Sequence, residues 1–402
     1  MTNTQTIAIE DTHYAPFFNK TRLSIERGQG VYVWDEEGRR YIDFTAGWGV
    51  TSIGHGSPVI AQALAEQSAK IIHNPDSGLT YSPARAKLLL LMQQVLPRGL
   101  RRVFFTNSGA EANDAAIKLA RKASGKLNIV STEKSFHGRT IGGVSATGQA
   151  MHRDKYKPLM PHHLYVPYDD VTALASVIRN DVAAFIVEPI QGEGGVRVPA
   201  DDYLEKVSVL CQQHGVYLIV DEVQTGFFRT GPAFVSSNRN IKIDFLTMAK
   251  GIAGGFPFGA FAMTEEVAQK LEKGDHGGTY CGNPLGCTVA SAVITHMIEN
   301  NVSKNVERMG AFVVSWLQAF QREYPHVVNE VRGKGLLIGV ELSSPALART
   351  IKEACLEQGL LVNLTQGTVI RIFPALTITE EEANEGLKIL ENVIRKVIDN
   401  AD

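Results

Sequence analysis

Short apolar runs alternate with longer amphipathic stretches between about residues 100 and 250. Runs of three or four apolar residues, separated by segments of helix length, are typical of buried strands joined by crossover helices in a mainly parallel sheet. The pattern therefore predicts an α/β fold. The expected strands are residues 103–105, 128–130, 184–187, 217–220 and 245–248.

The two ends of the chain have a different pattern. Residues 35–43 and 331–342 each resemble two short alternating strands joined by a turn. The turns are expected at Glu37-Gly38 and at Gly333-Lys334-Gly335. Both ends are therefore assigned to a smaller α+β domain.

The chain length agrees with one large and one small domain, because 402 residues exceed the usual size of a single domain. We expect the large domain over residues 59–284 and the small domain over residues 1–58 and 285–402. Apolar residues make up 44% and charged residues 20%, as in ordinary globular proteins. Disordered, collagen-like and coiled-coil proteins are therefore excluded.

The charges give no sign of a nucleic-acid or membrane partner. The formal net charge is −2, and no block of five like charges occurs. The N-terminus lacks the basic and apolar regions of a secretory signal, and the longest uncharged stretch, Phe44 to Ala65, is rich in glycine. We therefore expect a small-molecule ligand, no nucleic acid and no membrane.

Cysteine and histidine do not indicate a disulfide framework or a metal site. Four cysteines without paired spacing favour a reducing, cytoplasmic location. The pair His162-His163 lacks a nearby cysteine or carboxylate at ligand spacing, so we expect a surface loop there and no metal. The usual P-loop, hydrolase and zinc-protease motifs are missing from the sequence.

Polar or reactive residues follow several of the expected strands. Glu188, Asp221 and Lys250 each come directly after, or within two residues of, an apolar run. Ligands of open α/β sheets bind outside the carboxyl ends of the strands. These side chains should therefore converge on one crevice.

The segment Ser108-Gly109-Ala110 follows a strand and opens a helix that should run to about Arg121. Small residues at a helix N-terminus leave free N–H groups and the positive end of the dipole directed at an anion. The segment is a candidate phosphate site. An ordinary helix cap is the alternative.

Asp221 and Lys250 are expected at buried strand ends, where a charge needs a partner. A buried lysine can lose its proton and act as an amine nucleophile. The alternatives are an ion pair of Lys250 with Asp244 and a capping role for Asp221. Together with the phosphate site, however, the pair fits pyridoxal phosphate: Lys250 binds the aldehyde, and Asp221 keeps the ring nitrogen protonated.

Several short motifs occur in a characteristic order along the chain. They include residues 33–35, 41–44, 108–112, 136–140, 188–195, 221–226, 250–255, 278–280 and 282–284. With these motifs the chain resembles the class III, acetylornithine- and ornithine-like aminotransferases, which are pyridoxal-phosphate enzymes of fold type I. The resemblance implies a large domain with a mainly parallel seven-stranded sheet and a smaller α+β domain from both chain ends.

The resemblance also implies cofactor contacts. Phe136 would stack on the cofactor ring, Val223 would pack against its other face, and Gln224 would bond its phenolic oxygen. Thr279 would reach the phosphate of the neighbouring subunit, which implies a homodimer with shared sites.

Four further residues correspond to the family's substrate-binding positions. Arg139 and Arg371 would bind carboxylates, and Glu193 would pair with Arg371 while an ω-amino donor is bound. Tyr14 would touch the donor. Charge alone would place both arginines at the solvated surface.

The resemblance implies a ping-pong transfer of the ω-amino group of N-acetylornithine, or of a related diamino acid, to 2-oxoglutarate. The short stretch from Gly148 to Glu188 favours this donor. Residues 48–50 and 76–80 differ from the acetylornithine type, and residues 277–280 favour 4-aminobutyrate. Enzymes acting on 4-aminobutyrate or diamines, and glutamate-1-semialdehyde aminomutase, therefore stay as alternatives.

Overall fold

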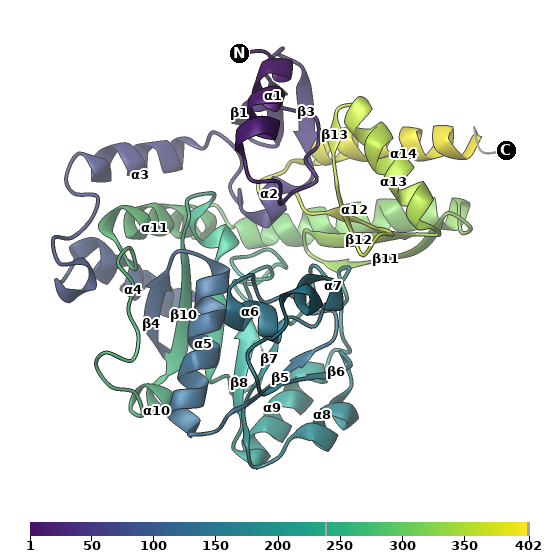
Figure 1. Cartoon of the computed structure of the whole chain (residues 1–402). Coiled ribbons are helices and arrows are strands. Elements are labelled where there is room, and N and C mark those ends of the chain that lie inside the picture. Colours follow the sequence, from purple (N-terminus) through teal and green to yellow (C-terminus); the bar gives the residue numbers. More distant parts are fainter. Residues whose placement is uncertain (238, 400–402) are drawn as a thin grey trace.

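The computed structural model describes residues 1–237 and 239–399. A seven-stranded sheet lies at its centre, in the spatial order β4-β10-β9-β8-β7-β5-β6 (Figure 1). The strands from β6 to β9 pair in parallel, whereas β10 is antiparallel to both of its neighbours. The mainly parallel seven-stranded sheet is thus confirmed. Its strands are β4 (Leu100–Thr106), β5 (Asn128–Thr132), β6 (His163–Val166), β7 (Val182–Val187), β8 (Tyr217–Asp221), β9 (Phe245–Met248) and β10 (Gly259–Thr264).

Two of the seven strands, β6 and β10, were not predicted. Each nevertheless contains a short apolar run, residues 164–166 in β6 and residues 260–263 in β10, so the sequence carried a signal for both. The prediction of a surface loop is wrong for His163, which belongs to β6 and pairs with Ile129 of β5. Burial lowers the pKa of His163 to about 3, so this ring is neutral at ordinary pH.

The two faces of the sheet are covered by different helices. The helix α5 (Gly109–Ser124) packs on one face, where it shares an apolar cluster with Ala184 and Ile219. The intervening side chains Phe185 and Leu218 belong to the other core, which includes residues of α9 (Tyr203–His214) and α11 (Pro284–Glu299). Strand side chains alternate between faces, so each face receives every second residue.

The other elements that accompany the central sheet are helices, most of them short. α11 packs against α3, α4 and η3, and the last of these begins with Lys250. The elements are α3 (Pro58–Ser68), η1 (Ser77–Leu79), α4 (Pro83–Val95), α6 (Ile141–Ala146), α7 (Ala150–Arg153), η2 (Asp154–Tyr156), α8 (Val171–Val177), η3 (Lys250–Ala253) and α10 (Glu265–Ala268).

Both chain ends contribute to the upper part of Figure 1. Leu360 of β13 pairs in parallel with Ile42 of β3, and this contact joins segments more than 300 residues apart. One small sheet has the order β1-β2-β3-β13 and the other β11-β12-β15-β14. The strands are β1 (Ile25–Gln29), β2 (Tyr32–Asp35), β3 (Arg40–Asp43), β11 (Val328–Lys334), β12 (Leu337–Leu342), β13 (Leu360–Leu361), β14 (Asn363–Thr365) and β15 (Val369–Ile372). The helices are α1 (Asn3–His13), α2 (Ala46–Gly49), α12 (Val302–Glu323), α13 (Pro345–Glu357) and α14 (Glu380–Asp399).

The two expected turns have different outcomes. Glu37 and Gly38 do lie between β2 and β3. Gly333 and Lys334 instead still belong to β11, where they pair with Ile338 and Leu337. The turn therefore begins at Gly335, which has a positive φ of 56°.

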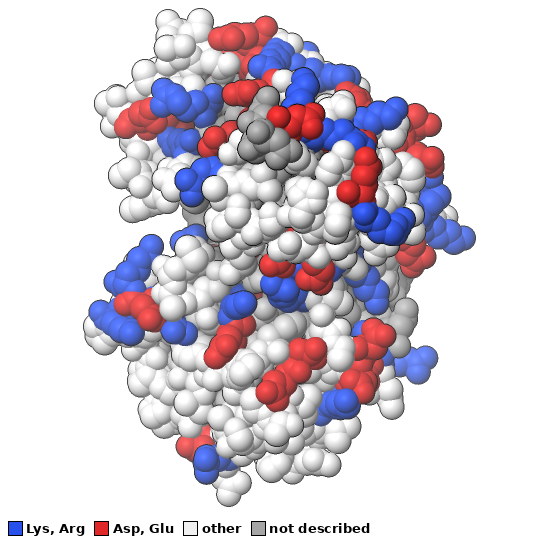
Figure 2. All heavy atoms as spheres, turned by 90° about the vertical axis from the view of Figure 1, so that its right-hand side faces the viewer, with Lys and Arg blue, Asp and Glu red and all other residues white. Residues whose placement is uncertain are grey.

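Positive and negative side chains are mixed over the face shown in Figure 2. Neither sign covers a continuous area of that face, in agreement with the even charge pattern of the sequence. Among the helices of the described residues, none combines the length and the apolar character needed to cross a membrane.

Candidate active site

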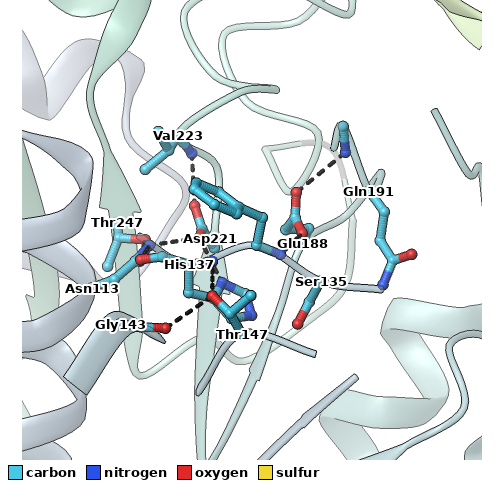
Figure 3. A network of polar contacts seen from close by, with 12 residues as sticks. Asn113, Ser135, His137, Gly143, Thr147, Glu188, Gln191, Asp221, Val223 and Thr247 are labelled. Atoms are coloured by element: carbon cyan, nitrogen blue, oxygen red, sulfur yellow. Dashed lines mark hydrogen bonds and ion pairs between the residues drawn. The ribbon is translucent and has the colours of Figure 1, made fainter. Parts of the chain in front are cut away.

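The carboxyl ends of the central strands meet at one place, as the sequence predicts. Asp221 ends β8, Glu188 follows β7, and Lys250 follows β9 by two residues. Asn113 of α5 bonds both Asp221 and Thr247 of β9, so the helix and two strand ends are tied together (Figure 3).

Asp221 is held by three hydrogen bonds in a buried position. Its Oδ2 accepts from Asn113 Nδ2 at 2.7 Å and from His137 Nδ1 at 2.8 Å, and its Oδ1 accepts from the backbone N–H of Val223 at 3.0 Å. The side chain of His137 is fully buried. The partners that a buried Asp221 needs are thus the imidazole of His137 and the side-chain amide of Asn113.

Asn113 and Thr247 were not singled out from the sequence. Thr247 Oγ1 donates to Asn113 Oδ1 at 2.6 Å, which leaves the amide nitrogen to donate to Asp221 and to the carbonyl of His137. The sequence nevertheless carried a signal for both residues, because each is a polar residue within an apolar pattern. Asn113 interrupts the buried stripe of α5, and Thr247 interrupts an apolar strand.

Lys250 lies half-buried at the start of η3, with a left-handed backbone φ of 46°. Burial lowers its pKa from 10.5 to about 8, although the charge of Glu193 opposes that shift. Asp244 accepts instead from the backbone N–H of Leu218 at 2.9 Å. Within the described residues no ion pair joins Lys250 to Asp244, so that alternative is wrong.

The start of α5 has the properties expected of an anion site. Ser108 caps the helix by accepting from the backbone N–H of Glu111. Among the described residues, none accepts from the backbone N–H of Gly109 or Ala110. A Cβ at Gly109 would lie 2.7 Å from Val223 Cγ1, so the helix start and the Val223 segment are in close contact. The serine cap therefore leaves backbone N–H groups at this helix start that an anion could use.

Phe136 lies beside the Asp221 network. Its backbone N–H donates to Glu188 Oε1 at 2.9 Å, and its ring meets His152 edge-on at 5.8 Å between centroids. The guanidinium of Arg139 is 5.8 Å from the Phe136 ring centroid, and the Arg139 side chain is exposed. Arg139 thus agrees with the solvated position expected from charge alone.

Arg371 is not at the surface, and that expectation is wrong. Its side chain is fully buried and pairs with Glu193 Oε1 at 2.7 Å. Gln224 donates to the same carboxylate oxygen at 2.8 Å and accepts from Arg371 at 3.2 Å. Burial disfavours the charged form of Glu193, but Arg371 and Lys250 outweigh it and lower the pKa of Glu193.

Two predicted residues lie apart from this group. Tyr14 is 55% exposed, and the Nζ of Lys20 lies 4.6 Å from its ring centroid. Thr279 is exposed, and its carbonyl accepts from Ser77. The single chain therefore does not bring Tyr14 or Thr279 to Asp221 and Lys250.

The group of residues fits pyridoxal phosphate. Asp221 can hold a positive ring nitrogen, Lys250 carries an amine of lowered pKa, and the start of α5 can receive a phosphate. Arg371 Nε and Nη2 are buried and have no hydrogen-bond partner in the described part of the chain. Those donors are available to a carboxylate ligand.

The sequence of this chain is similar to those of known aminotransferases. The family model described as aminotransferase class-III matches residues 14–394. An acetylornithine aminotransferase of Methanothermobacter thermautotrophicus is 41% identical over 397 residues, which cover 98% of this chain and 99% of that protein.

Two solved structures are also similar. The acetylornithine aminotransferase of Elizabethkingia anophelis has a TM-score of 0.87 and 32% identity, with 98% of this chain and 100% of that chain covered. The ornithine aminotransferase of Toxoplasma gondii, described with partial occupancy of PLP at its active site, has a TM-score of 0.92 and 32% identity, with 99% and 96% covered. By its sequence and by its fold, this chain belongs to the class-III aminotransferases, a family that depends on pyridoxal phosphate.

Proposed function

We propose that the chain transfers the ω-amino group of N-acetylornithine to 2-oxoglutarate. The observation that carries the proposal is the buried ion pair between Glu193 and Arg371. With the pair closed, Arg371 is covered and a substrate with one carboxylate can bind. With Glu193 displaced, the guanidinium is free for the second carboxylate of a dicarboxylic oxo acid. The name and full-length similarity of the M. thermautotrophicus relative support the donor.

The residues have the following roles in this proposal. When bound, pyridoxal phosphate supplies the electron-withdrawing ring needed for amino-group exchange. Lys250 holds the cofactor and then gives and takes a proton at Nζ, for which a pKa of about 8 is suitable. Asp221 stabilises a positive charge on the ring nitrogen.

Cofactor and substrate contacts complete the proposal. Ser108, Gly109 and Ala110 bind the phosphate, while Phe136 and Val223 pack on the ring and Gln224 bonds its phenolic oxygen. Arg139 binds the donor carboxylate, Arg371 binds 2-oxoglutarate, Glu193 covers Arg371, and Tyr14 contacts the donor.

The proposal extends to the assembly and the architecture. We propose a homodimer in which Thr279 contacts the phosphate of the partner's cofactor, because Thr279 is exposed and lies apart from the site of its own chain.

Residues 59–284 are proposed as the large domain, and residues 1–58 and 285–402 as the small one. A reducing, cytoplasmic location is proposed from the four cysteines, all unpaired in the described chain.

A donor panel with 2-oxoglutarate as acceptor tests the proposed reaction. We expect kcat/KM to fall in the order N-acetylornithine, ornithine, 4-aminobutyrate. Lys250→Ala is the control, and it should lose transamination by several orders of magnitude. A tenfold preference for 4-aminobutyrate would show that the donor is wrong while leaving the lysine chemistry intact. Product formation without an oxo acid would instead indicate an aminomutase.

A further inference from the structure

Glu188 lies between two segments that each carry a residue of the proposed site. Its Oε1 accepts from the backbone N–H of Phe136 at 2.9 Å, and its Oε2 accepts from the backbone N–H of Gly192 at 3.2 Å. Figure 3 shows Glu188 between the His137 segment and the loop that carries Gln191. One carboxylate therefore joins the two segments.

The first segment sets the surroundings of the cofactor. Phe136 is followed by His137, whose Nδ1 bonds Asp221 at 2.8 Å. A displacement of the Phe136 backbone would therefore move both the proposed ring contact and a partner of Asp221.

The second segment leads into the residue that covers Arg371. Gly192 precedes Glu193, and the carbonyl of Glu193 accepts from Thr365 Oγ1 and from Gln366 Nε2, both at 2.7 Å. The backbone is thus held on both sides of Glu193. Movement that uncovers Arg371 is then left to the Glu193 side chain.

A carboxylate is the group that this arrangement needs. The two backbone N–H groups meet different oxygens of Glu188, whereas an amide side chain would present an oxygen to one of them and an NH2 group to the other. Glu188 is 4% exposed, and burial raises its pKa to about 7. Burial disfavours the charged form of this carboxyl group, so its presence here indicates a specific role rather than a contribution to stability alone.

We infer that Glu188 is a positioning residue that couples the Phe136 segment to the backbone of Glu193, so that the ring contact and donor discrimination are set together. The inference rests on the proposed function, because Phe136 and Glu193 have their roles there. The competing explanation is that Glu188 only stabilises the end of β7.

Glu188→Gln separates these explanations, because it keeps the size of the side chain and removes one acceptor. Visible circular dichroism of the bound cofactor reports how its ring is held. The ratio of kcat/KM for the preferred ω-amino donor to that for glutamate reports how well Glu193 covers Arg371. We expect the dichroism to fall by at least half and the ratio to fall roughly tenfold.

Tyr168→Phe is the matched control. The Tyr168 hydroxyl bonds the carbonyls of Glu188 and Pro189 at 3.0 and 2.9 Å, so its removal disturbs the same loop without touching the carboxylate. We expect both readouts to stay within about twofold of the unmutated enzyme, even if the melting temperature falls.

A folded Glu188→Gln enzyme with unchanged dichroism and donor ratio would overturn the inference, as would an equal effect of Tyr168→Phe. If Glu188→Gln does not fold, Glu188→Asp replaces it, because its shorter carboxylate cannot reach both N–H groups. Unchanged readouts in Glu188→Asp would overturn the inference as well. Failure of N-acetylornithine as a donor of the unmutated enzyme would affect the proposed function alone, since the ratio is taken with whichever ω-amino donor the enzyme prefers.

Discussion

Lys250 is the residue whose surroundings change its chemistry most directly. It combines a left-handed backbone with a half-buried amine whose pKa is about 8. Asp221, by contrast, is fixed by donors on three sides. A group that must gain and lose a proton is therefore placed beside a carboxylate that three hydrogen bonds hold in one position.

The lowered pKa of Lys250 predicts its reactivity in cofactor-free protein. The amine is protonated below pH 8, so it should react slowly at pH 6 and with a half-maximal rate near pH 8. Exposed lysines of the same sample should still be far from their plateau at that pH. Labelling with a small amine-reactive reagent at several pH values, followed by peptide mass spectrometry, measures the reaction rates of Lys250 and of the exposed lysines. A half-point near pH 10 for Lys250 would contradict the effect of burial.

Replacement of Glu193 tests the cover over Arg371. Glu193→Gln removes the negative charge that holds Arg371, so the guanidinium should accept a carboxylate of glutamate more readily. We expect kcat/KM for glutamate relative to the ω-amino donor to rise roughly tenfold or more. Glu341→Gln is the control, because Glu341 pairs with Arg332 and Arg197 rather than with Arg371. A similar change in both variants would contradict the prediction.

The helix α5 shows how one element serves both the core and the site. Its buried stripe includes Ala112 and Ala116, packed on the central sheet, while Asn113 on the same side reaches Asp221. Its N-terminus faces the Val223 segment, and its C-terminus ends at Gly125 with a positive φ of 67°. The N-terminal glycine is therefore in close contact with a neighbouring segment, whereas the C-terminal glycine has a left-handed backbone and open surroundings.

Alanine substitutions at the two ends of α5 should have different effects. Gly109→Ala places a methyl group against Val223, so we expect cofactor affinity to fall by roughly tenfold as the anion site shifts. Gly125→Ala meets no neighbouring atom but needs a left-handed backbone, which costs about 1 kcal/mol of stability. Cofactor titration and thermal unfolding measure these effects. Equal cofactor affinity in the two variants would contradict an anion site at the start of α5.

In the whole molecule, segments from both chain ends close over the central sheet. Arg371 of β15 meets Glu193 across 178 residues, and β13 pairs with β3. The site therefore depends on the docking of the small sheets against the strand ends. Thr279 is exposed, which agrees with a role at a second copy of the chain.

Mixing two defective variants tests the shared site. In a mixed dimer of Lys250→Ala and Thr279→Ala, one site has both an intact lysine and an intact threonine from its partner. Random reassociation of equal amounts should therefore restore about a quarter of the unmutated activity, since half of the dimers are mixed and each has one intact site. Activity is measured after dissociation and reassociation, against unmixed parents. A mixture no more active than the mean of its parents would contradict the shared site.

Several local features of this protein could be predicted from residues that are neighbours along the chain. Apolar runs followed by polar residues placed Asp221 and Lys250 at strand ends, and a small-residue segment after a strand predicted the start of α5. These features depend on neighbours along the chain, so pattern and spacing were sufficient to predict them. β6 and β10 were not predicted, although residues 164–166 and 260–263 are short apolar runs of the same kind.

Contacts between groups that are distant along the chain could not be predicted in this way. The pairing of Glu193 with Arg371, the bonds of Asn113 to Asp221 and Thr247, and the bridge made by Glu188 join residues that lie far apart in the sequence. The burial of Arg371 likewise follows from the packing of β15 rather than from its charge. The physical reason is that packing selects these contacts after the strands are formed, and burial then sets the charge and pKa of each group.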